Sequence, residues 1–227
     1  TQIGSGVFGR NILAVGTTAA AATQLPVLLG ASAGGNGTVG IVPAATSANA
    51  GQFLRADSSW AAPASGGFTL GTEIATTSGT AADFTGIPAG TKVIIISLDG
   101  CSSAGANEVF QVLLGDSGGF ETTGYLSGIV NSAAAGNTFG STTAAFSIST
   151  GTSDAAATFS GSVILTLEDS TGFTWSCNSS IYVDSGTDHV DSGAGTKSLS
   201  AELTQVRLTT IGASTLDAGA VNIAYIG

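Results

Sequence analysis

Residues 92–98 read KVIIISL, and this short stretch decides the fold class. Val93 to Ile96 form the longest run of large apolar residues in the chain, and such branched side chains are typical of β-strands. Successive strand residues point to opposite faces, so Ile94 and Ile96 lie opposite Ile95. The run therefore predicts a strand that is buried on both sides, or one with a face turned toward a neighbouring chain.

The same strand signal recurs on either side of this stretch, from Phe68 to Gly227. Short runs of alternating apolar and polar residues are separated by Gly, Ser, Asn and Asp, and no convincing amphipathic helix interrupts them. This pattern predicts an all-β domain, a β-sandwich of jelly-roll type. We expect strands at residues 68–75, 82–84, 92–98, 108–114, 121–126, 145–149, 158–167, 172–177, 180–183, 197–199, 205–210 and 221–226. The expected core residues are Val93, Ile95, Phe110, Val112, Leu114, Phe159, Val163, Leu165, Leu167, Val206, Leu208 and Ile223.

The composition limits the possible partners. Only 9% of the 227 residues are charged, and the net charge is −10, which argues against nucleic acid as a partner. No apolar run approaches the ~20 residues of a membrane-spanning helix, so we expect no membrane insertion. A chain with so little charge stays soluble through Ser, Thr and Gly, or by covering surface in an oligomer.

The N-terminal third has a different character. Residues 17–25 begin with a threonine N-cap and continue as an alanine run, which predicts one short helix. Residues 37–66 follow with two large rings, Phe53 and Trp60, among small residues. One chain offers these rings little to pack against, so we expect several chains together to bury them. The sequence thus predicts a slender oligomeric stem before the sandwich.

Several of these segments resemble bacteriophage tail fibre proteins. The resemblance includes the Val42-Pro43 step, the Phe53-Leu54-Arg55-Ala56-Asp57 core and the closing Trp60. It continues in the C-terminal strand, where residues 216–225 read LDAGAVNIAY. The resemblance implies a stem segment at 1–36, a trimeric linker at 37–66 and a receptor-binding knob at 67–227. Thr1 is then either the start left after removal of the initiator Met or the beginning of a distal piece of a longer fibre.

The resemblance also implies a function. A fibre of this kind is part of the virion, exposed to the extracellular medium, and attaches the particle to the host cell. Its expected partners are two further copies of the chain, other virion proteins at the N-terminal end, and a glycan or protein of the host surface. The alternative is a structural head fibre or capsid decoration protein without a specific receptor.

The two cysteines, Cys101 and Cys177, lie far apart in the sequence. Because phage proteins mature in a reducing cytosol, the resemblance favours two buried free thiols, with a disulfide as the alternative. There is no CxxC pair and only one histidine, so we expect no zinc site and no other cofactor.

Binding residues are sought among aromatic and short polar side chains near strand ends and turns, which suit sugar rings and hydroxyls. The candidates are Tyr125, Tyr182, Asn178, Asp188 and His189. Trp175 is expected to be half buried, because Phe173 and Cys177 share its face.

No constellation of catalytic residues is evident, and we expect a protein that is not an enzyme. The loop 183–193, VDSGTDHVDSG, holds His189 among three aspartates, but the GxSxG elbow of a hydrolase is absent. Asp184, Asp188 and Asp191 form a weak calcium candidate without the EF-hand pattern. A solvated turn between strands is the simpler interpretation of this loop. The residues 117–119 between Asp116 and Glu121 predict a tight hairpin turn.

Overall fold

A computed structural model describes residues 48, 50–62, 66–133, 136–151 and 154–227. The chain divides into two units between Ser65 and Gly66, each described by itself below. The stem segment 1–36 and the expected helix at 17–25 lie outside the described residues. Within the described part no helix is long and apolar enough to cross a membrane.

The described part of the first unit is one small hairpin. β1 (Phe53–Leu54) pairs with β2 (Trp60–Ala61), and Leu54 lies opposite Trp60. The Asp57 carboxylate closes the turn by accepting hydrogen bonds from the Ser59 amide at 2.9 Å and from its hydroxyl at 2.6 Å. Such a hairpin is at best marginally stable alone in water, because it buries almost no apolar surface.

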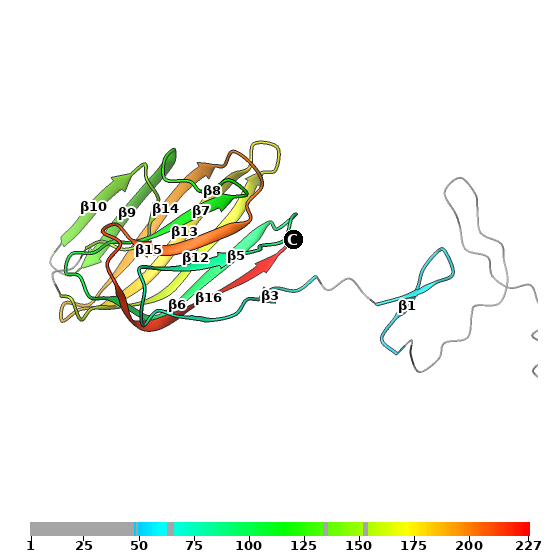
Figure 1. Ribbon diagram of the computed structural model, residues 1–227, viewed down its shortest axis with the longest axis horizontal. Helices are drawn as coiled ribbons and strands as arrows, with labels where there is room; N and C mark the ends of the chain where they lie inside the picture. Colours follow the sequence, from blue (N-terminus) through cyan, green and yellow to red (C-terminus); the bar gives the residue numbers. More distant parts are fainter. Residues whose placement is uncertain (1–47, 49, 63–65, 134–135, 152–153) are drawn as a thin grey trace, which may run out of the picture. The chain divides into compact units, whose positions relative to one another are not determined.

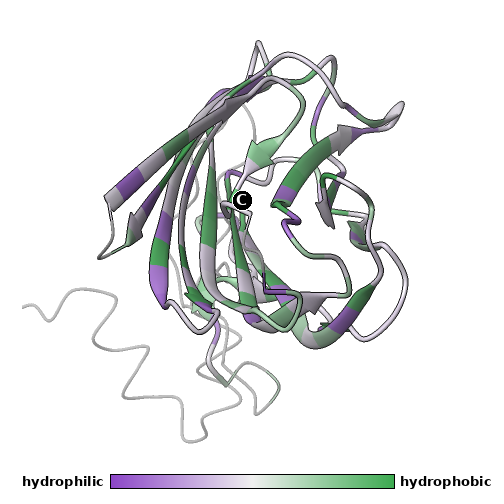
Figure 2. Cartoon of the chain, turned by 90° about the vertical axis from the view of Figure 1, so that its left-hand side faces the viewer, coloured by the Kyte–Doolittle hydropathy of each residue, from purple (hydrophilic) through white to green (hydrophobic). Residues whose placement is uncertain are grey.

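The second unit is a sandwich of two antiparallel sheets (Figures 1 and 2). The large sheet has nine strands and the small sheet has five. The large sheet runs in the order β10 (Gly136–Thr142), β9 (Tyr125–Ala133), β14 (His189–Ser198), β13 (Thr174–Asp184), β12 (Thr158–Asp169), β6 (Val93–Ser103), β16 (Leu216–Ile226) and β3 (Thr69–Leu70), with β4 (Ile74–Ala75) also on β16. The small sheet runs β11 (Phe146–Ser147), β7 (Phe110–Asp116), β15 (Gln205–Thr210) and β5 (Ala81–Thr85), with β8 (Gly119–Phe120) on β7. The all-β prediction is confirmed.

Neighbouring strands are often distant in the sequence, as in a jelly roll. β14 pairs with β9, β12 with β6, and β15 with β7, because the chain crosses repeatedly between the two sheets. Only a few turns connect adjacent partners. The turn between β7 and β8 is one of them: Asp116 lies opposite Gly119, and its carboxylate accepts the Gly118 amide at 2.7 Å. This confirms the tight hairpin expected there.

The core fills the space between the sheets. Phe110 of β7 and Phe159 of β12 meet across it with ring centroids 4.7 Å apart. Burying a side chain of this size stabilises the fold by about 1.5–3 kcal/mol. Most expected core residues are buried there: Phe110, Val112, Leu114, Phe159, Val163, Leu165, Val206, Leu208 and Ile223. Leu167 is partly buried against this cluster.

The prediction assigned the wrong face of the KVIIISL strand to the core. Ile94 and Ile96 are fully buried inside the sandwich, whereas Val93 and Ile95 are half-buried on the opposite side. Because the run is apolar on both faces, its periodicity could not reveal which face points inward. Pairing with β12 and β16 fixes it.

Two strand predictions need a further correction. β10 was not expected, and β14 was predicted only at residues 197–199, with the rest of it assigned to a turn. Both segments contain two glycines together with Asn or Asp, residues with weak strand preference, so pairing with neighbours must impose the extended conformation. β13 is also one continuous strand rather than two.

Both cysteines are buried and free, which confirms the favoured expectation. Cys101 lies on β6 and Cys177 on β13, with β12 between the two strands.

Candidate functional site on the outer face of the large sheet

The outer face of the large sheet is almost free of charge over its five central strands, β6, β12, β13, β14 and β9. Along β13, residues alternate regularly between buried and solvent-facing. Carboxylates at outward positions of these five strands lie only toward the two ends of the face. Asp99 and Asp184 lie near the end that carries Tyr182, and Glu168 lies at the opposite end beside Asp169, the last residue of β12. The remaining outward positions carry small, hydroxyl-bearing or apolar side chains, among them Ile95, Ser97, Ser162, Ile164, Thr166, Asn178, Ser180, Ser192, Ala194, Thr196, Leu126 and Val130.

The register aligns these side chains in rows across the strands. Ile95 lies opposite Ile164, Ile164 opposite Asn178, and Asn178 opposite Ala194. Ile164 remains 42% exposed, although it is a large branched residue at the centre of the face. The face therefore offers apolar contact and neutral hydrogen-bonding groups side by side.

Tyr182 of β13 is the most prominent aromatic side chain among the residues predicted to bind a ligand. Its ring is 46% exposed, and its hydroxyl donates to the Asp188 carboxylate at 2.8 Å. The same carboxylate accepts the Ser185 amide at 3.3 Å, which ties it to the turn between β13 and β14. This hydrogen bond raises the pKa of Tyr182, so the hydroxyl stays protonated and the ring stays neutral.

Asn178 shares the outer face with Tyr182, four residues earlier on β13, and is exposed. The Tyr182 ring, the Asn178 amide and the Asp188 carboxylate thus lie on one surface, as the sequence suggested. They are held by strand β13 and a short turn rather than by a cluster of long loops.

His189 does not lie on that surface. It begins β14 in phase with the buried Asp191, and its side chain is only 7% exposed. The Nδ1 atom is 2.9 Å from the Thr187 carbonyl oxygen, and Nε2 is 3.7 Å from Asp191 Oδ1 with no hydrogen-bond partner. We therefore leave His189 out of the candidate site.

Asp191 anchors a polar group inside the sandwich. Its carboxylate accepts the Thr150 amide and the Thr150 hydroxyl, and Asn131 in turn donates to that hydroxyl at 3.2 Å. Burial raises the pKa of Asp191 despite these hydrogen bonds. The Asp191 carboxylate lies between the Thr150 hydroxyl and the His189 imidazole. His189 is therefore not placed to take a proton from Thr150 as a general base would.

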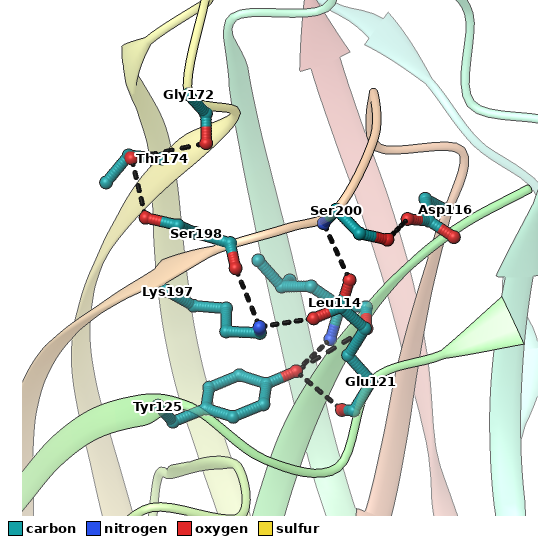
Figure 3. A network of polar contacts seen from close by, with 9 residues as sticks. All are labelled: Leu114, Asp116, Glu121, Tyr125, Gly172, Thr174, Lys197, Ser198 and Ser200. Atoms are coloured by element: carbon teal, nitrogen blue, oxygen red, sulfur yellow. Dashed lines mark hydrogen bonds and ion pairs between the residues drawn. The ribbon is translucent and has the colours of Figure 1, made fainter. Parts of the chain in front are cut away.

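Tyr125, a candidate binding residue, is buried and does not present an exposed ring. Its hydroxyl accepts the Leu114 amide at 2.8 Å and donates to the Glu121 carbonyl at 3.0 Å (Figure 3). The Lys197 ammonium lies 5.4 Å from the ring centroid and pairs with the Glu121 carboxylate. Burial raises the pKa of Tyr125. This network binds the two sheets together, and Tyr125 cannot contact a ligand.

The acidic loop does not assemble a metal site. Among the residues that the structure describes, no three His, Cys, Asp or Glu side chains gather closely enough to hold an ion. Asp188 is engaged by Tyr182, and Asp191 points inward. The calcium interpretation thus finds no support in this part of the chain.

A second exposed feature, not foreseen from the sequence, lies at the β10 edge of the large sheet. Phe139 of β10 is 75% exposed and Leu126 of β9 is 70% exposed, and both line one shallow depression. Ile211, 60% exposed, shares a second depression with Phe139. Sequence reasoning missed this group because β10 itself was not predicted.

Comparison with known proteins finds no matching family model, no matching curated relative and no matching solved structure. The interpretation of the site therefore depends on its own geometry and on the sequence resemblance.

Proposed function

We propose that this protein is the receptor-facing part of a bacteriophage fibre and that the outer face of its large sheet binds a host glycan without cleaving it. The resemblance of the linker and of the C-terminal strand to tail fibres supports the virion role. The observation that carries the choice of ligand is the exposed Tyr182 ring, held by Asp188 beside an uncharged face that carries Asn178.

The chemistry of this face suits a sugar. An aromatic ring stacks on the apolar face of a pyranose, while Ser, Thr and Asn side chains exchange hydrogen bonds with its hydroxyls. An anionic ligand would find no outward-facing Lys or Arg on these five strands, because the one basic residue among them, Lys197, is buried. Each site is small, so firm adhesion would come from several copies acting together on one cell surface.

Adsorption of the purified protein to host cells tests this proposal. Tyr182→Ala and Asn178→Ala should each weaken adsorption, whereas Thr85→Ala, at an exposed position of β5 in the small sheet, should leave it unchanged. Tyr182→Phe keeps the ring and loses the hydroxyl, so it should retain most of the adsorption if stacking dominates. Unchanged adsorption by Tyr182→Ala together with Asn178→Ala would refute the site.

Treatment of the host cells identifies the receptor class. Periodate oxidation of cell-surface sugars should abolish adsorption, and protease treatment should leave it intact. Release of reducing sugar from host polysaccharide by the purified protein would contradict binding without cleavage. Antibody labelling of whole particles should mark the tail; labelling of the head with no effect on adsorption would favour the decoration protein instead.

A further inference from the structure

The edge strand β10 differs from every other edge of the sandwich. β3, β4 and β11 have two residues each, which leaves little backbone to pair with. β5 has five residues but carries Asp83, which forms a bidentate pair with Arg207. β10 has seven residues, Gly136–Thr142, and contains neither charge nor proline. Natural sheets normally protect an edge by shortness, charge, proline or a bulge, and this edge has no such protection.

The surroundings of β10 lack charge as well. Between Glu121 and Asp154 the sequence contains no charged residue, although this interval includes β9, β10 and β11. Within it lie the exposed Phe139 and Leu126, and Ile211 approaches from the end of β15. Among the strands that the structure describes, β10 ends the large sheet without a further partner, and this edge coincides with a cluster of exposed large apolar side chains.

We infer that the β10 edge pairs with the β10 edge of a second copy of this chain. The chain carries a net charge of −10, so two copies repel each other unless they meet where carboxylates are absent. The β10 edge is such a place. A strand from a cationic partner would gain nothing from this uncharged surface, whereas a copy meets a neutral edge identical to its own.

The strand is suited to antiparallel pairing about a two-fold axis. Phe139 is its central residue, so pairing about Phe139 sets the two phenyl rings side by side on the outer face. The same register places Asn137 opposite Ser141 of the other copy and Thr138 opposite Gly140, and no like charges oppose each other. Such a contact is self-complementary and joins the two large sheets into one continuous sheet.

A charge-swap experiment on the full-length chain tests both the contact and its register. Asn137 and Ser141 are exposed and lie on the same face of β10, so substitution there spares the core. Asn137→Lys with Ser141→Lys places lysines directly opposite each other and should weaken association by about tenfold or more. Asn137→Glu with Ser141→Glu should do the same, and an equimolar mixture of the two variants should associate again.

Sedimentation over a dilution series gives the mass of each sample. Whatever number of chains the N-terminal segment joins, pairing through β10 adds further copies, so the parent and the mixture should be heavier than either variant alone. Ser97→Lys with Ser180→Lys adds the same charge at exposed positions on the central outer face and should associate like the parent. Circular dichroism melts verify that all variants are folded.

Hydrogen exchange provides a second measurement that does not depend on mass. Amides of β10 that point away from β9 should exchange slowly in the associated parent and quickly in the lysine variant. Equal masses of parent and lysine variant, with equally fast exchange of β10, would overturn the proposal. Failure of the mixture to associate would also overturn it, since the antiparallel register requires opposite charges to meet.

Discussion

At the scale of single residues, the Tyr125 hydroxyl links the two sheets through hydrogen bonds. It accepts the buried Leu114 amide and donates to the Glu121 carbonyl, so one oxygen satisfies two backbone groups. Tyr125→Phe leaves the Leu114 N–H without this acceptor, and we expect a loss of about 1–3 kcal/mol of unfolding free energy. Tyr182→Phe, at an exposed position, should cost less than about 0.5 kcal/mol. Denaturant unfolding of both variants measures the difference; equal losses would contradict this assignment.

The buried Asp191 carboxyl predicts a pH-dependent stability. Its pKa in the folded protein is raised above the unfolded value of about 3.9 by burial. The folded state therefore favours the protonated form, and this contribution is present below the unfolded pKa and lost as pH rises through the folded pKa. Asp191→Asn cannot ionise, so its stability relative to the parent should rise over that window.

Unfolding by urea at a series of pH values measures this relative stability. Asp217→Asn, which removes an exposed carboxyl on β16, is the control for the loss of one negative charge. A difference between Asp191→Asn and the parent that stays constant with pH would show that Asp191 titrates alike in both states.

At the scale of elements, β14 adopts its place because small residues let its neighbours approach. A Cβ atom at Gly195 would lie 2.2 Å from the Leu126 carbonyl oxygen and 3.1 Å from the Phe146 ring. Gly195→Ala should therefore cost about 1–3 kcal/mol through displacement of β9 and Phe146. Ala194→Ser, on the solvent face of the same strand, should change stability by less than about 0.5 kcal/mol. Thermal melts of the two variants compare them directly; a neutral Gly195→Ala would mean that β14 adjusts without cost.

At the scale of the whole molecule, the sandwich should fold without the N-terminal segment. The boundary between Ser65 and Gly66 separates two units, and the core described above draws only on the second. A fragment of residues 67–227 should therefore show a cooperative, β-rich melt by circular dichroism. A disordered fragment would place essential contacts in residues before Gly67.

The N-terminal segment should in turn hold three chains together. Phe53 remains 47% exposed in a single chain, and the two-stranded hairpin that carries it has no core of its own. Trp60→Ala should weaken association by up to about 3–5 kcal/mol if the ring is buried between chains, and leave the melt of the sandwich unchanged. Sedimentation of the full-length chain measures this, and a parent that remains monomeric at micromolar concentration would refute it.

The sequence by itself determined the fold class and most of the core. Alternation along segments such as Gln205–Leu208 carries that information, because one face of the strand is apolar and the other is polar. It also marked Tyr182, Asn178 and Asp188, which the structure places on one surface.

Only the tertiary structure decided which face of Val93–Ile96 points inward. Both faces of this run are apolar, so the local sequence pattern does not distinguish them. Only the tertiary structure revealed β10 and most of β14, whose Gly, Asn and Asp residues have weak strand preference and become extended through pairing across the sheet. The burial of Tyr125 likewise depended on a strand of the other sheet, which carries Leu114. The burial of His189 depended on the pairing of β14 with β13, where His189 lies opposite the buried Val183. Residue type sets what a side chain can do, and pairing with distant strands sets whether it faces solvent or the core.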